Sequence, residues 1–224
     1  MAKVKPIQIK TPKASLLWAN IDGEGKENLS GKFKYVVTAV VAEDSEIVKS
    51  IKEYWAENKP KGFKDVKKDE SNPKGYKSIG IYPHTVKTDE VDEDGDAIYE
   101  TVEGLVELRF STDTTWPDGK AKVINIYNAR GNKVKLPEGT KIGNDSLGKV
   151  AGAMGLYTVE KAGKVLDAGV TLYLNGIQIL KLVEYNADDG FDADDSEEDG
   201  FTGDEGWSGE EDTTASEPTE KTRL

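Results

Sequence analysis

The segment GNDSLGKV, residues 143–150, is the part of this sequence that comes nearest to a known chemical motif. In a phosphate-binding P-loop, G-x-x-x-x-G-K-[ST], glycine amides surround the phosphates, the lysine reaches the outer ones and the final hydroxyl binds Mg²⁺. Gly143, Gly148 and Lys149 match this pattern, but Val150 stands where the hydroxyl is required. Two further glycines follow shortly, and each costs the interior of the required helix about 1 kcal/mol. The segment therefore predicts a turn that leads into a strand, without ATP binding.

An acidic segment, DEVDEDGDAIYET, partly matches a calcium-binding loop. Asp92, Asp94 and Gly95 would occupy the third, fifth and sixth positions of such a loop. The first position is then Glu90, and the twelfth is Thr101, where a bidentate glutamate is required. We therefore expect an acidic turn here and no metal site.

Few residues of this chain are suited to covalent or acid–base catalysis. The sequence has no cysteine, which excludes disulfides, thiolate metal sites and a cysteine nucleophile. The single histidine, His84, follows a proline and is predicted to lie in a loop. Carboxylates are abundant but no spacing singles out a pair, so a hydrolase acting through carboxylates stays an open alternative. Apolar runs are too short for a membrane span, and residues 1–13 lack the apolar region of a secretory signal. We expect no catalytic residue, no cofactor, no metal and no membrane partner.

The net charge of −12 is concentrated at one end of the chain. Residues 186–224 contain 15 acidic residues against two basic ones, which leaves 27 acidic and 28 basic residues in the rest. A segment rich in Asp, Glu, Gly and Ser buries too little apolar surface to offset its ordering entropy, so a disordered tail is expected. Phe191, Phe201 and Trp207 recur in it, which favours a partner-binding role over a merely solubilising extension.

Hydrophobic periodicity predicts a mainly β body with one main helix. KFKYVVTAVVA alternates like a strand, whereas EDSEIVKSIKEYWAEN has helical spacing, with Asp44 or Ser45 able to cap its start. We expect a helix at 45–58 and strands at 15–21, 32–42, 76–82, 98–110, 122–128, 149–160 and 168–185. This order predicts a small antiparallel barrel or sandwich, with the helix as a plug or cap through Ile47, Ile51 and Trp55.

Several predicted strands carry an aromatic ring together with a base or an amide on their polar face. In three of these strands the apolar residues lie on one face, and the opposite face carries polar or aromatic side chains. These are Glu107 and Arg109 in 98–110, Tyr127 in 122–128, and Lys149 and Tyr157 in 149–160. Stacking on a nucleobase requires an exposed ring, and the adjoining phosphate requires a cation. Each tyrosine alone is equally well a half-buried rim residue, so the prediction depends on their recurrence. The candidate DNA-binding residues are Trp18, Lys34, Tyr76, Lys77, Arg109, Trp116, Lys120, Lys122, Tyr127, Arg130, Lys149, Tyr157 and Tyr173.

Three segments, INIYNARGNKV, KIGNDSLGKVAGAMGLYTVE and GVTLYLNGIQILKLVEY, come in this order before the acidic tail. Together with the basic start, the strand pair and the helix, this order resembles the replicative single-stranded DNA-binding proteins of tailed bacteriophages, of the type found in short-tailed coliphages. The resemblance implies an OB-fold-like antiparallel barrel with one main α-helix. It divides the chain into a basic N-terminal arm (1–13), an OB-fold DNA-binding domain (14–185) and a disordered acidic tail (186–224). One departure is the ending EKTRL, since tails of this family usually end in acids and an aromatic residue.

The resemblance implies a non-catalytic protein that coats single-stranded DNA, without marked sequence preference, during phage DNA replication, recombination and repair. It places the protein in the cytoplasm of the infected bacterial host and Lys149 at the edge of the DNA surface. It gives the tail, with Phe191, Phe201 and Trp207, two roles: competing with DNA, and recruiting replication proteins such as the phage DNA polymerase. A homodimer stays open. The main alternative is an acidic-tailed protein-interaction module with no nucleic-acid role.

Overall fold

The computed structural model describes residues 5–28, 31–61, 63, 76–92, 94–137 and 140–184. This part of the chain is mainly β. Its strands are β1 (Ile7–Lys10), β2 (Ala14–Asn20), β3 (Lys26–Glu27), β4 (Phe33–Ala42), β5 (Ile81–Val91), β6 (Ala97–Asp113), β7 (Asn125–Tyr127), β8 (Lys133–Val134), β9 (Ser146–Lys161) and β10 (Lys164–Lys181). Its helices are α1 (Glu46–Asn58) and the short 3₁₀ helix η1 (Lys77–Ile79). In these ranges no helix is long and apolar enough to cross a membrane.

Five strands form a closed ring in the order β9, β2, β4, β6 and β10, and β10 pairs back with β9. A five-stranded ring is the barrel of an OB-fold, so the predicted fold class is confirmed. The pair that closes the ring, β6 with β10, is short and parallel, with Leu172 opposite Phe110. The sequence predicted a small antiparallel barrel or sandwich, and this parallel pair differs from that prediction. The other four pairs of the ring are antiparallel, and a closed ring with an odd number of strands cannot have antiparallel pairs alone, so one pair must be parallel.

Alternate side chains of the ring strands fill one hydrophobic core. Leu108 and Phe110 of β6 and Leu172 and Leu174 of β10 are at most 2% exposed, as the predicted alternation requires. Burying each such side chain contributes roughly 1.5–3 kcal/mol. The core is therefore determined by the two-residue period of the strands.

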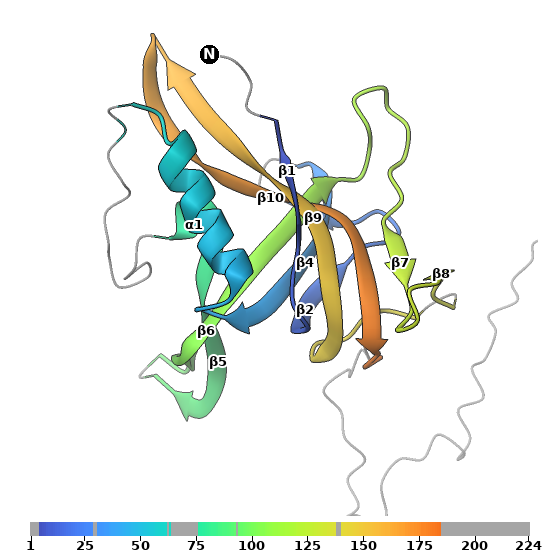
Figure 1. The fold of residues 1–224 in the computed structure, drawn as a ribbon. Coiled ribbons are helices and arrows are strands. Elements are labelled where there is room, and N and C mark those ends of the chain that lie inside the picture. Colours follow the sequence, from blue (N-terminus) through green and yellow to red (C-terminus); the bar gives the residue numbers. More distant parts are fainter. Residues whose placement is uncertain are drawn as a thin grey trace, which may run out of the picture. The chain divides into compact units, whose positions relative to one another are not determined.

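The helix α1 covers one side of the ring, between the projecting β5–β6 and β9–β10 hairpins (Figure 1). Ile47, Ile51 and Tyr54 are buried, and Trp55 is half-buried against the same core. The Tyr54 hydroxyl also accepts a hydrogen bond from the backbone N–H of Leu156 at 3.1 Å, which ties the helix to β9. The predicted capping role of the helix is confirmed.

The start of α1 differs from the prediction in one detail. Ser45 occupies the N-cap position with extended backbone, but its side chain makes no capping hydrogen bond. Packing of Ile47 and Ile51 against the core stabilises the first turns of this helix without a side-chain cap.

The hairpin of β5 and β6 is longer than predicted. β5 continues to Val91, and Asp92 organises the turn, since its Oδ1 accepts the backbone N–H of Asp94 at 3.0 Å and of Asp96 at 2.8 Å. In the described ranges no cluster of three or more metal-ligating side chains occurs. The prediction that His84 lies in a loop is wrong: it lies within β5, because the long β6 offers pairing positions far beyond residue 82.

Two stretches with other expected roles form strands: part of residues 1–13, and the second half of GNDSLGKV. Part of the predicted basic arm is β1, which pairs with β9 from Ile7 to Lys10. β9 begins at Ser146, so Lys149 and Val150 lie in a strand and no helix follows them. The prediction that GNDSLGKV turns into a strand is confirmed.

Candidate nucleic-acid interface

A groove of about 950 Å³ crosses the outer side of β4, β6 and β10, hereafter the central groove. Its lining also includes side chains from β2, β3, η1, β5 and β9. Segments far apart in the sequence therefore meet here. The lining residues with aromatic or basic side chains at its surface are Trp18, Lys26, Lys34, Lys77, Tyr82, Arg109 and Tyr157. Five of them, Trp18, Lys34, Lys77, Arg109 and Tyr157, are among the residues predicted from sequence.

The central groove is rich in positive charge. Lys26, Lys34, Lys77 and Arg109 line it, against Glu27 as the acidic lining residue. Lys34 lies 3.8 Å from an exposed aspartate of β6, a separation at which water screens most of the attraction. The lining thus carries three more basic than acidic side chains and can attract a polyanion.

The ring of Tyr157 lies against the backbone of the neighbouring strand. Gly169 pairs with Tyr157 across β9 and β10, and a Cβ at Gly169 would come within 2.7 Å of the tyrosine ring. The same Cβ would meet the carbonyl oxygen of Ser78 at 1.9 Å, so only glycine fits between the ring and η1. Burial raises the pKa of Tyr157 above its ordinary value, and the nearby Asp167 carboxylate acts in the same direction. The phenol is therefore neutral at physiological pH.

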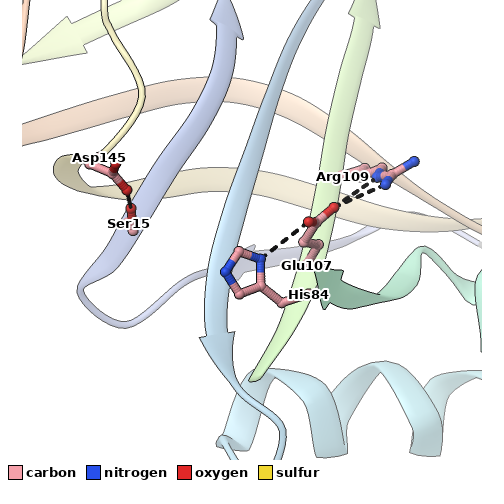
Figure 2. Close-up of polar contacts among 5 residues, drawn as sticks. All are labelled: Ser15, His84, Glu107, Arg109 and Asp145. Atoms are coloured by element: carbon pink, nitrogen blue, oxygen red, sulfur yellow. Dashed lines mark hydrogen bonds and ion pairs between the residues drawn. The ribbon is translucent and has the colours of Figure 1, made fainter. Parts of the chain in front are cut away.

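Arg109 is held at the groove by a buried acid (Figure 2). The Glu107 carboxylate accepts hydrogen bonds from Arg109 Nη2 at 2.9 Å and Nε at 3.3 Å, and it lies 3.3 Å from Nδ1 of His84. The guanidinium carbon of Arg109 is 4.0 Å from the ring centroid of Tyr82, a cation–π arrangement. Arg109 is thus held over an aromatic ring, with part of its charge compensated.

Glu107 differs from the expectation for a polar strand face. The alternation places it beside Arg109, as predicted, but it is only 5% exposed because β5 covers it. A buried carboxylate is strongly destabilising unless it is paired and hydrogen-bonded. His84 and Arg109 provide those partners, which explains how the buried Glu107 is tolerated. The sequence did not predict this cluster of three side chains.

A second, smaller cavity of about 530 Å³, hereafter the side hollow, lies among β1, β10 and the loop from 114 to 124. It gathers three more predicted residues, Trp116, Lys122 and Tyr173. Lys122 Nζ lies 4.7 Å from the Trp116 ring centroid and donates a hydrogen bond to Thr112 Oγ1 at 3.0 Å. Tyr173 packs at Gly155, where a Cβ would come within 3.0 Å of its ring.

The remaining predicted residues lie outside both cavities. Tyr76 packs partly on the core and lies under Lys52, whose Nζ is 4.5 Å from the ring centroid. Tyr127 is half-buried in β7, and Arg130 is exposed in the turn that follows it. Lys120 forms an exposed ion pair at 3.1 Å with the aspartate of its own turn.

Lys149, predicted at the edge of the DNA surface, lines a separate hollow at the start of α1. Its neighbours there include Lys10, Thr11 and Ser45. The structure therefore does not bring Lys149 together with the residues of the central groove. The predicted tail residues Phe191, Phe201 and Trp207 lie outside the described residues.

Sequence reasoning missed Tyr82 and Lys26. Tyr82 follows the buried Ile81 in β5, so alternation places it on the outer face, but the predicted strand ended at residue 82. Lys26 lies in β3, a two-residue strand too short to produce any period. The signal for Tyr82 is its position next to the buried Ile81, which places its ring on the opposite face of the strand.

The sequence matches no protein-family model, and no curated protein is significantly similar to it. Solved structures do resemble it. One is gp2.5, a single-stranded DNA-binding protein encoded by bacteriophage T7, with a TM-score of 0.51 and 18% identity, covering 88% of this chain and 98% of that chain. The single-stranded DNA-binding protein from bacteriophage Enc34, in complex with single-stranded DNA, gives a TM-score of 0.45 and 15% identity, covering 79% and 88%. The likeness to gp2.5 confirms the predicted resemblance in fold.

Proposed function

We propose that this protein binds single-stranded DNA in the central groove without marked sequence preference and has no catalytic activity. The observation that carries this proposal is the meeting of Trp18, Tyr82 and Tyr157 with the four basic side chains of one groove. Exposed rings stack on any base, and nearby cations contact the phosphates between them. The likeness in fold to a phage single-stranded DNA-binding protein supports the same conclusion.

The energetics favour non-specific binding. A stacked base contributes roughly 1–3 kcal/mol, and rings read no hydrogen-bonding pattern, so every base is accepted. Each phosphate that a lysine or arginine neutralises adds a salt-dependent term. Each ring that stacks on a nucleobase therefore adds to the affinity without selecting a sequence, and each phosphate contact adds a part that salt weakens.

The test is a titration of fluorescently labelled oligonucleotides, followed by anisotropy at several salt concentrations. We expect similar affinities for homopolymeric and mixed single strands, and a roughly tenfold loss or more for Tyr157→Ala. Tyr99→Ala is the matched control, because Tyr99 is 63% exposed on β6 but lines neither cavity. Undetectable binding of single-stranded DNA by the full chain at low salt would overturn the proposal and favour a protein-interaction module.

The proposal extends to the biological setting. Coating of single strands fits a role in phage DNA replication, recombination and repair in the cytoplasm of the infected host. The acidic residues of 186–224 are covalently attached to a nearly neutral body, and tethering gives them effective concentrations near millimolar. They compete with DNA for the central groove, and Phe191, Phe201 and Trp207 contact replication proteins such as the DNA polymerase.

Removal of residues 186–224 tests the role of the tail. We expect tighter DNA binding by the truncated protein at low salt, with the difference shrinking as salt screens the acidic residues. A variant that keeps the tail length but replaces its acids by Asn and Gln separates charge from tethering. Equal affinities of all three proteins at low salt would contradict competition, and unchanged polymerase association after truncation would contradict recruitment.

A further inference from the structure

Trp18 has a backbone conformation that is unusual for a bulky residue. Its φ is +54°, in the left-handed region that L residues with a Cβ rarely adopt. Pairing of β2 with β4 shifts between Leu17 and Asn20, so Trp18 lies in a β-bulge. Bulges redirect a side chain out of the sheet. The Trp18 side chain lines the central groove and is 65% exposed.

The loop before β9 holds this bulge. Asn144 Oδ1 accepts a hydrogen bond from the backbone N–H of Trp18 at 2.9 Å. The next residue, Asp145, donates its backbone N–H to the carbonyl oxygen of Leu16 at 3.1 Å. Its carboxylate accepts a hydrogen bond from the Ser15 hydroxyl at 3.1 Å (Figure 2). Three attachments along β2, at Ser15, Leu16 and Trp18, therefore come from two adjacent loop residues.

The same loop is anchored on its other side. Gly143 donates its backbone N–H to the carbonyl oxygen of Val183 at 2.8 Å, and a Cβ at Gly143 would come within 3.0 Å of that oxygen. The Ser146 hydroxyl donates to the Gly143 carbonyl at 2.8 Å and accepts the backbone N–H of Val183 at 3.0 Å. The amide of Asn144 is thus fixed between the end of β10 and the bulge of β2.

We propose that Asn144 is a positioning residue for single-stranded DNA binding, which fixes the bulge that presents the Trp18 indole to a base in the central groove. This inference rests on the proposed function, and it adds how the protein holds the Trp18 ring in the central groove. The segment GNDSLGKV, which resembles a phosphate-binding loop in sequence, then serves DNA binding through a side-chain amide rather than through its lysine. Fixing the indole before binding removes part of the ordering cost on association.

A double-mutant cycle tests whether Asn144 acts through Trp18. Asn144→Leu keeps the side-chain size but removes the acceptor, and Asn144→Asp keeps an acceptor oxygen. We expect Trp18→Ala to weaken oligonucleotide binding roughly tenfold and Asn144→Leu by several-fold. Asn144→Leu should have no further effect in the Trp18→Ala background. Asn144→Asp should restore affinity once moderate salt screens its added charge.

A spectroscopic readout separates positioning from a general loss of structure. In full-length protein labelled with 5-fluorotryptophan, the Trp18 resonance is assigned by its loss in Trp18→Phe. We expect DNA to shift this resonance, and Asn144→Leu to shift it in the free protein while the Trp116 resonance stays in place. If Asn144→Leu unfolds early on heating, Asn144→Ala takes its place, since it adds no larger apolar group.

The outcomes distinguish this inference from the proposed function. If the affinity loss of the double variant equals the product of the losses of Asn144→Leu and Trp18→Ala, the two residues act independently. This result would overturn the inference. Full affinity of Asn144→Leu beside a weakened Trp18→Ala would also overturn it. Full affinity of Trp18→Ala would remove Trp18 from the DNA contact while the function stands. Absence of DNA binding by the unaltered protein would overturn both.

Discussion

The central groove and the side hollow contain the same kinds of residues but differ in size and in how many basic side chains line them. Both combine aromatic rings with basic side chains. In the side hollow the one basic lining residue, Lys122, is already committed to the Trp116 ring and to Thr112. In the central groove Arg109 is likewise engaged, by Glu107 and by the Tyr82 ring, and Lys34 lies near Asp113. The difference is one of number and space, since four basic side chains line the larger central groove with Glu27 as its acidic lining residue, whereas one basic side chain lines the side hollow.

The largest expected difference between the two cavities concerns their rings. Trp18→Ala combined with Tyr157→Ala should weaken binding of a short oligonucleotide on the order of a hundredfold, since each stacked base contributes roughly 1–3 kcal/mol. Trp116→Ala combined with Tyr173→Ala should change it by less than about threefold. Anisotropy titrations of both double variants measure this. A larger loss from the second pair would assign the main DNA path to the side hollow.

Basic residues inside and outside the central groove should differ in how much they contribute to the salt dependence of DNA affinity. Lys34→Gln in the central groove should lower the slope of log affinity against log salt by about 0.7, the value for one phosphate on a single strand. Lys120→Gln is the matched control, because Lys120 is exposed and pairs with the aspartate of its own turn. We expect no change of slope for it. Equal slopes for both variants would contradict phosphate contacts by Lys34.

A smaller effect is expected from the buried acid behind Arg109. Glu107→Gln removes the negative charge that compensates the guanidinium, so binding should become a few-fold tighter at low salt, with a steeper salt dependence. The melting temperature should fall, since the variant loses the charge-assisted hydrogen bonds of a buried carboxylate. Weaker DNA binding with an unchanged slope would indicate instead that the orientation of Arg109 on Tyr82 matters more than its charge.

The smallest effect concerns the titration of Tyr157. Its pKa is raised by burial and by Asp167, so the neutral phenol should persist above the ordinary tyrosine range. A raised pKa contributes stability that is present below the unfolded pKa of about 10 and is lost as the pH rises through the folded pKa. Asp167→Asn should lower the Tyr157 pKa, as measured by NMR of labelled tyrosine rings. An unchanged pKa in this variant would contradict a contribution from Asp167 and leave burial as the main cause.

Much of the core was readable from sequence because the period of a strand is local. The apolar faces predicted for 98–110 and 168–185 are those that fill the barrel, and the helical spacing of Ile47 and Ile51 placed α1 on it. The strand following GNDSLGKV was likewise predicted from its glycines and the missing hydroxyl. Each of these inferences needs only the few residues on either side.

The binding surface required the tertiary structure, because its contacts join residues far apart in the chain. His84 and Glu107 meet only when β5 pairs with β6, and this pairing turned a predicted loop residue into part of a buried cluster. Lys149 and Tyr157 share β9, but an extended strand separates residues eight positions apart, so the two line different cavities.

Local patterns in the sequence predict a mainly β body, much of its core, one helix and the concentration of acidic charge in residues 186–224. These follow from hydrophobic period, turn residues and composition, which act over short stretches. Only the tertiary structure decided which candidate rings and cations share a groove, and that the amide of Asn144 holds the bulge at Trp18. The physical reason is that closure of the ring and the bulge in β2 set directions for side chains that no local pattern encodes.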